Sequence, residues 1–361
     1  MFDFQLDPEL ELLVETARSF AREELLPRLR EAESARELDP GVRASFTEVG
    51  FAGLELPEAS GGAGLGSLAR VLVNEELAAG DAGAAVALDP LGAALYPLLE
   101  LGGPAAIEEL ALPLLAREGA RAVLVAAADA ELEVGSDSVS GTVPWVPADR
   151  VDLMVVLDSE CALVLRSGIE TEALRGAGLR AAGASALRLH NAPIVARFEG
   201  REQAGRALAR ARLYVASLLL GVLRQACEFS SDYALERVAF GRPIAHHQAL
   251  AFLIVDMRAA VDGARLLLHE AASQMDRGPA SPVLAASAFI EAVDASCFVG
   301  PNGVQILGGH GFMQDYPVEK YMRESRALGL VLGGIDAARE EAGRALCDSV
   351  DPVALSEPEI A

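Results

Sequence analysis

Apolar residues recur at helical spacing in the first third of the chain. From Leu10 to Phe20 they return every three or four residues on one face, which is the pattern of an amphipathic helix packed on a core. Asp7 and Pro8 stand immediately before this pattern, and an Asp N-cap followed by Pro is a typical helix start. The glycine-rich segment 50–66 predicts a loop with sharp turns, and a second helix is expected through 72–79.

The pattern changes between about residues 119 and 202. Short runs that favour β-strands appear there, separated by Gly, Pro, Asp and Asn, and they predict a small β-domain. The runs are 122–127, 139–146, 151–157, 161–165, 186–190 and 192–198.

Helical periodicity returns from about residue 203, and segments with short connections predict a helical bundle. The four helices are expected at 205–235, 247–275, 282–306 and 318–347. The fold class is therefore mainly α with a small β-domain. The expected divisions are an N-terminal helical domain at 1–118, a shortened middle β-domain at 119–202, a C-terminal bundle at 203–349 and a loose tail at 350–361.

Charge and hydropathy exclude two classes of partner. Acidic residues number 53 against 30 basic ones, a formal charge of −23, which opposes general binding to nucleic acids or anionic membranes. The longest apolar run, Leu213 to Leu223, lies between two arginines and is shorter than the roughly 20 residues of a membrane span. No secretory signal is expected, because the N-terminus has no basic segment followed by an apolar one.

The cysteines indicate a reducing compartment. Four of them are widely spaced, with no CxxC pair, which suits reduced thiols in a cytoplasm better than disulfides or zinc ligation. The histidines do not cluster with the cysteines, so no metal site is expected. The four cysteines are Cys161, Cys227, Cys297 and Cys347.

Several distinctive strings occur in order along the chain. The N-terminal part contains FDFQLDPELELLVETARSFAREELLP, GFAGLELPEASGGAGLG and EELA, and the C-terminal part contains YALERVAFGRPIAHHQAL and GVQILGGHGFMQDYPVEKYMRES. Together these strings resemble the acyl-CoA dehydrogenase family of flavoproteins. The resemblance covers essentially the whole chain. It implies the family's three-domain fold, with a middle β-barrel or sandwich and a C-terminal four-helix bundle. It also implies FAD as cofactor, an acyl-CoA substrate, and electron-transferring flavoprotein as the usual electron acceptor.

The two C-terminal strings contain candidate cofactor-binding residues. By themselves they are typical of helix-end packing and a turn, although an Arg fork suits phosphate and glycines allow close backbone approach. The resemblance implies that Arg237, Phe240 and Gln248 reach across a dimer interface to the FAD of a neighbouring subunit. It implies that Gln305, Gly308 and Gly309 contact the ADP part of the same flavin. His246, His247 and His310 lie in these strings and are interpreted as having no catalytic role.

The catalytic base expected from the resemblance is missing. The family reaction removes the proton alpha to the thioester, a step that needs a positioned carboxylate, while the beta hydrogen passes to the flavin as hydride. The usual Glu position holds Leu332, and the alternative position holds Ala211, followed by Arg212, which is expected to bind substrate. Asp336, one helical turn after Leu332, could project the same way, but a cap or surface acid is the plainer interpretation.

The predicted flavin-ring pocket also departs from the family. The usual Thr-Glu-Pro-x-Ala-Gly-Ser-Asp loop is replaced by VAAADAELEVGSD, and only Trp145 remains of a Trp-Ile-Thr-Asn element. These changes remove hydrogen-bonding partners of the ring. Pro301, inside the helix before QILGG, suggests local remodelling.

Three hypotheses remain open. The first is a subunit of a heteromeric acyl-CoA dehydrogenase, a heterotetramer in which a second family chain supplies the base and most of the acyl-CoA pocket. The second is a self-sufficient homotetrameric flavoenzyme with a different base. The third is a non-catalytic scaffold that keeps the fold without flavin.

Overall fold

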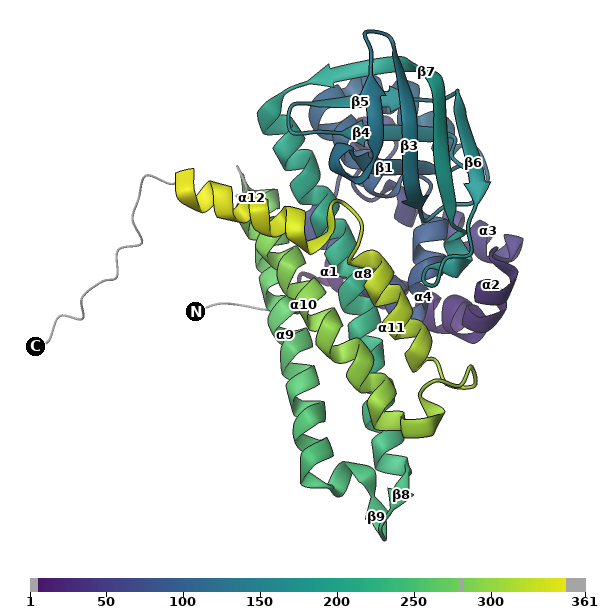
Figure 1. The fold of residues 1–361 in the computed structure, drawn as a ribbon, viewed down its shortest axis with the longest axis vertical. Coiled ribbons are helices and arrows are strands. Elements are labelled where there is room, and N and C mark those ends of the chain that lie inside the picture. Colours follow the sequence, from purple (N-terminus) through teal and green to yellow (C-terminus); the bar gives the residue numbers. More distant parts are fainter. Residues whose placement is uncertain (1–5, 279–281, 349–361) are drawn as a thin grey trace, which may run out of the picture.

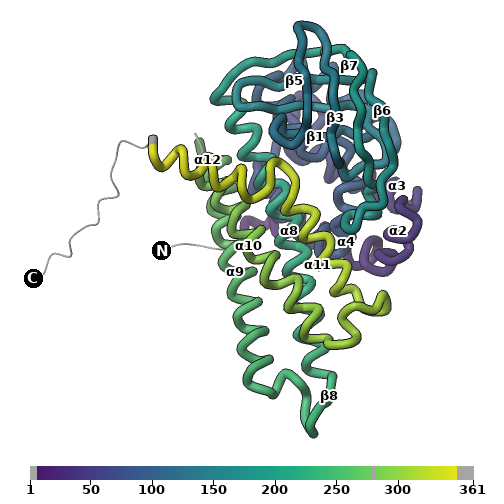
Figure 2. The backbone as a smooth tube through the Cα atoms, in the orientation of Figure 1, coloured from purple at the N-terminus to yellow at the C-terminus, as the bar shows by residue number. Residues whose placement is uncertain are grey.

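The computed structural model describes residues 6–278 and 282–348. It consists of N-terminal helices, a β-domain and a bundle of long helices (Figure 1). The β-domain lies at one end of the bundle, and a two-stranded hairpin forms the opposite tip (Figure 2). The expected tail at 350–361 lies outside the described residues.

The N-terminal helices begin where the sequence predicts. The Asp7 side chain accepts hydrogen bonds from the amides of Glu9 and Leu10 at 3.1 and 2.9 Å, which confirms it as the N-cap of α1. Turns of 3-10 or π-helix connect several of the elements. The helices are α1 (Pro8–Phe20), α2 (Leu29–Ala35), α3 (Pro40–Val49), α4 (Ser67–Leu88), α5 (Leu95–Pro97), α6 (Gly103–Ala106) and α7 (Leu112–Leu115).

The β-domain is one seven-stranded sheet in the order β1-β4-β5-β7-β3-β2, with β6 also paired to β7. Only β1 and β4 run parallel among these pairs. The inward side chains form a separate apolar core that includes Val125, Met154 and Leu187. The strands are β1 (Ala122–Ala126), β2 (Glu131–Val134), β3 (Ser138–Val146), β4 (Leu153–Leu157), β5 (Cys161–Leu165), β6 (Ile169–Ala173) and β7 (Ser185–Glu199).

Two strand predictions were incomplete. The segments 186–190 and 192–198 form one long strand, β7, because Asn191 between them takes a positive φ of 46° without ending the pairing. Strands β2 and β6 were not predicted, since their sequences ELEV and IETEA contain two glutamates each and are mostly exposed. They are held by pairing with β3 and β7 rather than by burial.

The C-terminal part contains five helices instead of four. The prediction of one helix over 318–347 was wrong, because Leu332, Gly333 and Gly334 all have positive φ values and break the helical path. Helix α10 runs through Pro301 without a break, so the expected remodelling does not end it. The helices are α8 (Arg201–Glu236), α9 (Gln248–Arg277), α10 (Pro282–Leu307), α11 (Val318–Leu328) and α12 (Gly334–Asp348); β8 (Val238–Ala239) and β9 (Arg242–Pro243) form the tip hairpin.

Apolar helices fill the interior. The run from Leu213 to Leu223 is buried throughout, as its composition predicts. By length and composition alone, Pro282–His310 could cross a membrane, and so could Ser67–Leu88 combined with Gly92–Leu115 across a bend. However, α10 packs against α8, α9 and α11, and α4 is buried against α8. Packing within the molecule therefore accounts for their apolar composition.

Close packing of α8 on α4 yields a stability prediction. A Cβ atom at Gly221 of α8 would lie 2.2 Å from the carbonyl oxygen of Glu75. Gly221→Ala should therefore destabilise the protein by about 1–3 kcal/mol through overpacking. At Gly205, also in α8, an added Cβ atom would have no neighbour within 4 Å, so Gly205→Ala should gain about 0.5–1 kcal/mol. Urea unfolding of both variants measures the difference, and equal stabilities would refute the packing argument.

Candidate functional site

Leu332 lies in the wall of a small cavity between the β-domain and the helices. The side chain is 4% exposed, and its φ of +58° costs about 1–2 kcal/mol for a residue with a Cβ. The cavity has a volume of about 80 Å³, whereas ligand pockets usually span about 300–1,000 Å³. Its walls include Asp89, Arg121, Tyr214, Leu218, Leu328 and Leu332.

Asp89 is the one carboxylate among the described residues that line this cavity, and its oxygens are already engaged. Oδ1 accepts the amides of Leu91 and Gly92 at 3.2 and 2.9 Å. Oδ2 accepts the Tyr214 hydroxyl at 3.2 Å and lies 3.6 Å from Nη1 of Arg70. Burial, together with the Asp89 charge, raises the pKa of Tyr214 well above its ordinary value. Neither side chain is therefore arranged as a free proton acceptor.

Arg121 closes another side of the cavity. Its guanidinium donates to the carbonyl oxygens of Val86, of Asp89 at 3.1 Å and of Pro147 at 3.2 Å. The side chain thus ties the end of α4 to the loop after β3. A charged residue immediately before the apolar strand β1 was the only signal in the sequence for this position.

Asp129 holds in place the loop that contains Leu332. Oδ2 accepts the Gly333 amide at 2.8 Å. Burial raises the pKa of Asp129, and hydrogen bonds from the Gly333 and Leu332 amides oppose part of that rise. Three successive residues with positive φ present these amides on one concave side, an arrangement that suits a negatively charged acceptor. The carboxylate of this chain therefore fills the space beside Leu332.

The remaining residues predicted for this region do not line the cavity. Arg212 is 1% exposed, and its Nη1 donates to Oε2 of Glu341 on α12 at 2.7 Å. Ala211 beside it is fully buried. Asp336 at the start of α12 is exposed to solvent. Trp145 is half-buried at the edge of the main core. The expected substrate-binding role of Arg212 stays a prediction.

The predicted cofactor-binding residues gather at the other end of the bundle. Arg237 ends α8, Phe240 lies in the β8–β9 hairpin, and Gln248 begins α9 (Figure 1). Phe240 is 96% exposed and has a φ of +51°. Gln305, at the end of α10, and Gly308 and Gly309, just after it, are exposed as well.

The tip and the Leu332 cavity are too far apart to share one cofactor within a chain. Tyr214 in the cavity wall and Arg237 lie on the same helix, 23 residues apart. At 1.5 Å per residue this is about 35 Å, more than the roughly 30 Å diameter of a small domain. A cofactor held at the tip therefore has its reactive part outside the Leu332 cavity of the same chain.

Two of the three histidines near the tip have specific contacts. His310 stacks on Tyr316 with ring centroids 5.0 Å apart, and its Nδ1 lies 2.7 Å from the Tyr233 hydroxyl. His247 Nε2 lies 3.1 Å from the carbonyl oxygen of Ala239. His246 is exposed. No group of three or more His, Cys, Asp or Glu residues in the described ranges could hold a metal ion.

Comparison with known families covers both helical parts of the chain. The family model described as acyl-CoA dehydrogenase, N-terminal domain, matches residues 7–118, and that described as acyl-CoA dehydrogenase, C-terminal domain, matches residues 199–347. The chain belongs to the acyl-CoA dehydrogenase family.

Individual relatives match nearly end to end. Cyclohex-1-ene-1-carbonyl-CoA dehydrogenase of Syntrophus aciditrophicus is 28% identical over 95% of this chain and 91% of its own length. Butyryl-CoA dehydrogenase from Megasphaera elsdenii has the same fold, with a TM-score of 0.83 at 24% identity over 96% of this chain and 100% of that one. A chain of the ChsE4-ChsE5 complex from Mycobacterium tuberculosis gives a TM-score of 0.84 at 24% identity over 97% and 100%.

The residues of this acyl-CoA dehydrogenase family member fit only part of the flavin that the family implies. The exposed guanidinium of Arg237 and the backbone at Gly308 and Gly309 suit a pyrophosphate. A cavity of about 80 Å³ that is lined in part by Arg121 does not fit a three-ring system. No reaction step can therefore be assigned to a flavin ring inside this chain.

The Asp129 contact can be tested by hydrogen exchange. Asp129→Ala removes the acceptor for the Leu332 and Gly333 amides, and a hydrogen bond to a charged group is worth about 1.5–3 kcal/mol. We expect exchange in a peptide spanning 329–336 to become about 10- to 100-fold faster. Asp137→Ala is the control, because that exposed carboxylate contacts only the Ser136 hydroxyl. Unchanged exchange in Asp129→Ala would contradict the inference that Asp129 holds this loop in place.

Proposed function

We propose that this chain is a subunit of an FAD-dependent acyl-CoA dehydrogenase that lacks its own catalytic base and completes the FAD site of a second, unlike chain. The separation of the two halves of the expected site carries this proposal. The cavity at Leu332 has a volume of only about 80 Å³, and its one carboxylate among the described residues is already hydrogen-bonded. The residues expected to hold the ADP part of a flavin are exposed at the far tip.

The surface at the tip supports a contact with another chain. Large apolar side chains are exposed around the hairpin and just beyond α10, and exposed apolar surface of this kind is typical of protein interfaces. Phe240, nearly fully exposed on a strained backbone, is the extreme case. The other members are Leu235, Val238, Phe312 and Met313.

In the proposed assembly the two chains divide the work. The partner supplies the Glu that removes the alpha proton, together with most of the acyl-CoA pocket. FAD accepts the hydride when it is bound. Arg237 of this chain would offset phosphate charge, Phe240 would cover an apolar face, and Gln248 would donate and accept hydrogen bonds. Electron-transferring flavoprotein as acceptor and a cytoplasmic location complete the proposal.

The fold accommodates such a pairing, since the ChsE4-ChsE5 structure that it resembles is named as a complex of two chains. The small size of the cavity argues against the homotetrameric alternative, in which each chain would need its own base and ring pocket. The exposed tip argues against a scaffold without flavin, because a residue such as Arg237 has no ion-pair partner among the described residues.

The decisive variant is Arg237→Ala in a complex with a second, unlike chain of the family. Loss of one charge-assisted hydrogen bond should weaken FAD retention about 10- to 100-fold, measured as flavin absorbance retained after dialysis. Arg188→Ala is the control, because Arg188 forms an exposed ion pair with Glu172 on the β-domain, away from the tip.

Other results would overturn the proposal. If the chain alone is yellow and oxidises an acyl-CoA, it is a self-sufficient enzyme. If the two chains form a stable complex that binds no FAD, the scaffold hypothesis holds. Leu332→Glu alone should create no activity, because the cavity beside it is too small for a flavin ring.

A further inference from the structure

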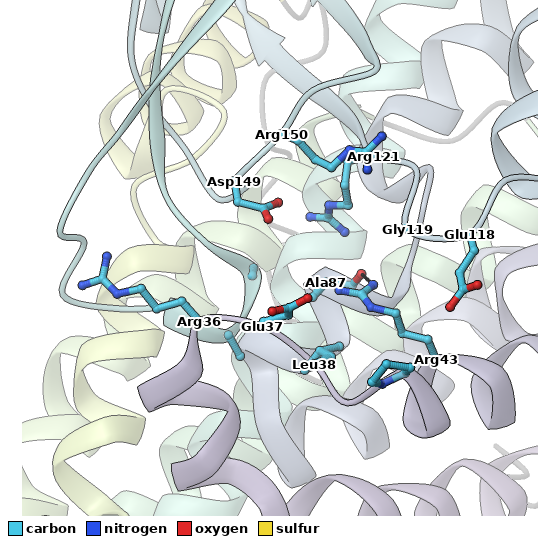
Figure 3. Close-up of a pocket in the computed structure, with 13 residues that line it drawn as sticks. Arg36, Glu37, Leu38, Arg43, Ala87, Glu118, Gly119, Arg121, Asp149 and Arg150 are labelled. Atoms are coloured by element: carbon cyan, nitrogen blue, oxygen red, sulfur yellow. Dashed lines mark hydrogen bonds between the residues drawn. The ribbon is translucent and has the colours of Figure 1, made fainter.

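A second hollow lies between the N-terminal helices and the β-domain, on the other side of Arg121 from the Leu332 cavity. Its volume is about 290 Å³, and it opens between α3 and the loop that precedes β4. Figure 3 shows the side chains of Arg43 and Arg121 pointing toward each other across this hollow, whereas Arg36 points away. Two positively charged groups thus face the same space.

Neither arginine has a carboxylate partner among the described residues. Arg43 donates to the carbonyl oxygen of Ala87 at 3.1 Å, and Arg121 donates only to backbone carbonyl oxygens. Most arginines of this strongly acidic chain form ion pairs, including the buried Arg70 and Arg210. Arg43 and Arg121 therefore differ from most arginines of the chain, because neither forms an ion pair.

Arg121 is the more constrained of the two. It is 5% exposed, and its Nε has no hydrogen-bond partner. Burial lowers the pKa of Arg121, the neighbouring Tyr214 and Asp89 oppose this, and the charge of Arg43 lowers it again. No carboxylate among the described residues forms an ion pair with its guanidinium, and a buried charge without a close partner is unfavourable.

We propose that this hollow binds a small phosphate-bearing ligand between Arg43 and Arg121. Planar guanidinium groups bind phosphate through paired hydrogen bonds. A phosphate monoester carries about −1.5 to −2 charges at pH 7, which matches two guanidinium groups, whereas one carboxylate does not. The exposed acids Glu37, Glu118 and Asp149 also line the hollow and disfavour a large polyanion.

Inorganic phosphate titrated calorimetrically into the full-length chain at low ionic strength tests the site. The measurement needs neither FAD nor a partner, so it is independent of the proposed function. We expect saturable binding that Arg43→Ala weakens about 10-fold or more. Arg43→Lys keeps the charge without the fork and should give an intermediate affinity.

The matched control is Arg166→Ala. Arg166 also lacks a carboxylate partner and also joins the β-domain to the N-terminal helices, by donating to the carbonyl oxygens of Glu109 and Leu110. It does not line the hollow. Phosphate affinity should be unchanged in this variant.

Competition between phosphate and coenzyme A distinguishes a nucleotide ligand from a small free phosphate. Displacement of phosphate by coenzyme A would support the site and indicate a nucleotide ligand, and binding that coenzyme A does not disturb would support it for a small free phosphate. Absence of saturable binding, equal weakening by Arg43→Ala and Arg166→Ala, or tighter binding of acetate than of phosphate would overturn the proposal.

Discussion

The burial of α4 on nearly all sides is the constraint on which the rest of the structure depends. All of its residues except Leu68 and Val86 are buried, although the helix carries several charged groups. Each buried charge needs a partner, since a single unpaired one is strongly destabilising. The partners come from other elements: Glu55 for Arg70, Arg224 and Arg265 for Glu75, and Lys320 for Asp81. These pairs fix how α4 sits among α8, α9 and α11, and the contact at Gly221 fixes how closely α8 approaches.

The same helix explains why the two parts of the expected site differ. The end of α4 leads directly into Asp89 and supplies carbonyl oxygens to Arg121, so the small Leu332 cavity is lined by groups that also hold the β-domain in place. The residues at the tip do not help to hold the β-domain in place. It lies beyond the contact with α4, and its residues remain exposed for a partner chain.

Sequence reasoning succeeded where signals are local and failed where they are tertiary. Three short-range patterns were recognised: the Asp7 cap, the apolar run from Leu213 to Leu223 and the family strings. The structure shows the first two directly, as a helix cap and as a buried segment. The break at Leu332 was missed although the Gly333–Gly334 pair is a local turn signal, because the helical pattern on both sides was read as continuous. Arg121 and Asp129 were missed because their partners lie far away in the sequence, at Val86 and Pro147 for the first and at Gly333 for the second.

Lys320 is the single lysine of the chain. Its ammonium group is fully buried, 2.9 Å from Asp81 on α4 and 2.5 Å from Glu324 on α11. Amine-specific reagents therefore find no lysine side chain on the folded surface. A reagent molecule can reach this one only when α4 and α11 separate. The protein thus contains a natural reporter group, and the rate at which Lys320 becomes chemically labelled measures how often the centre of the molecule opens.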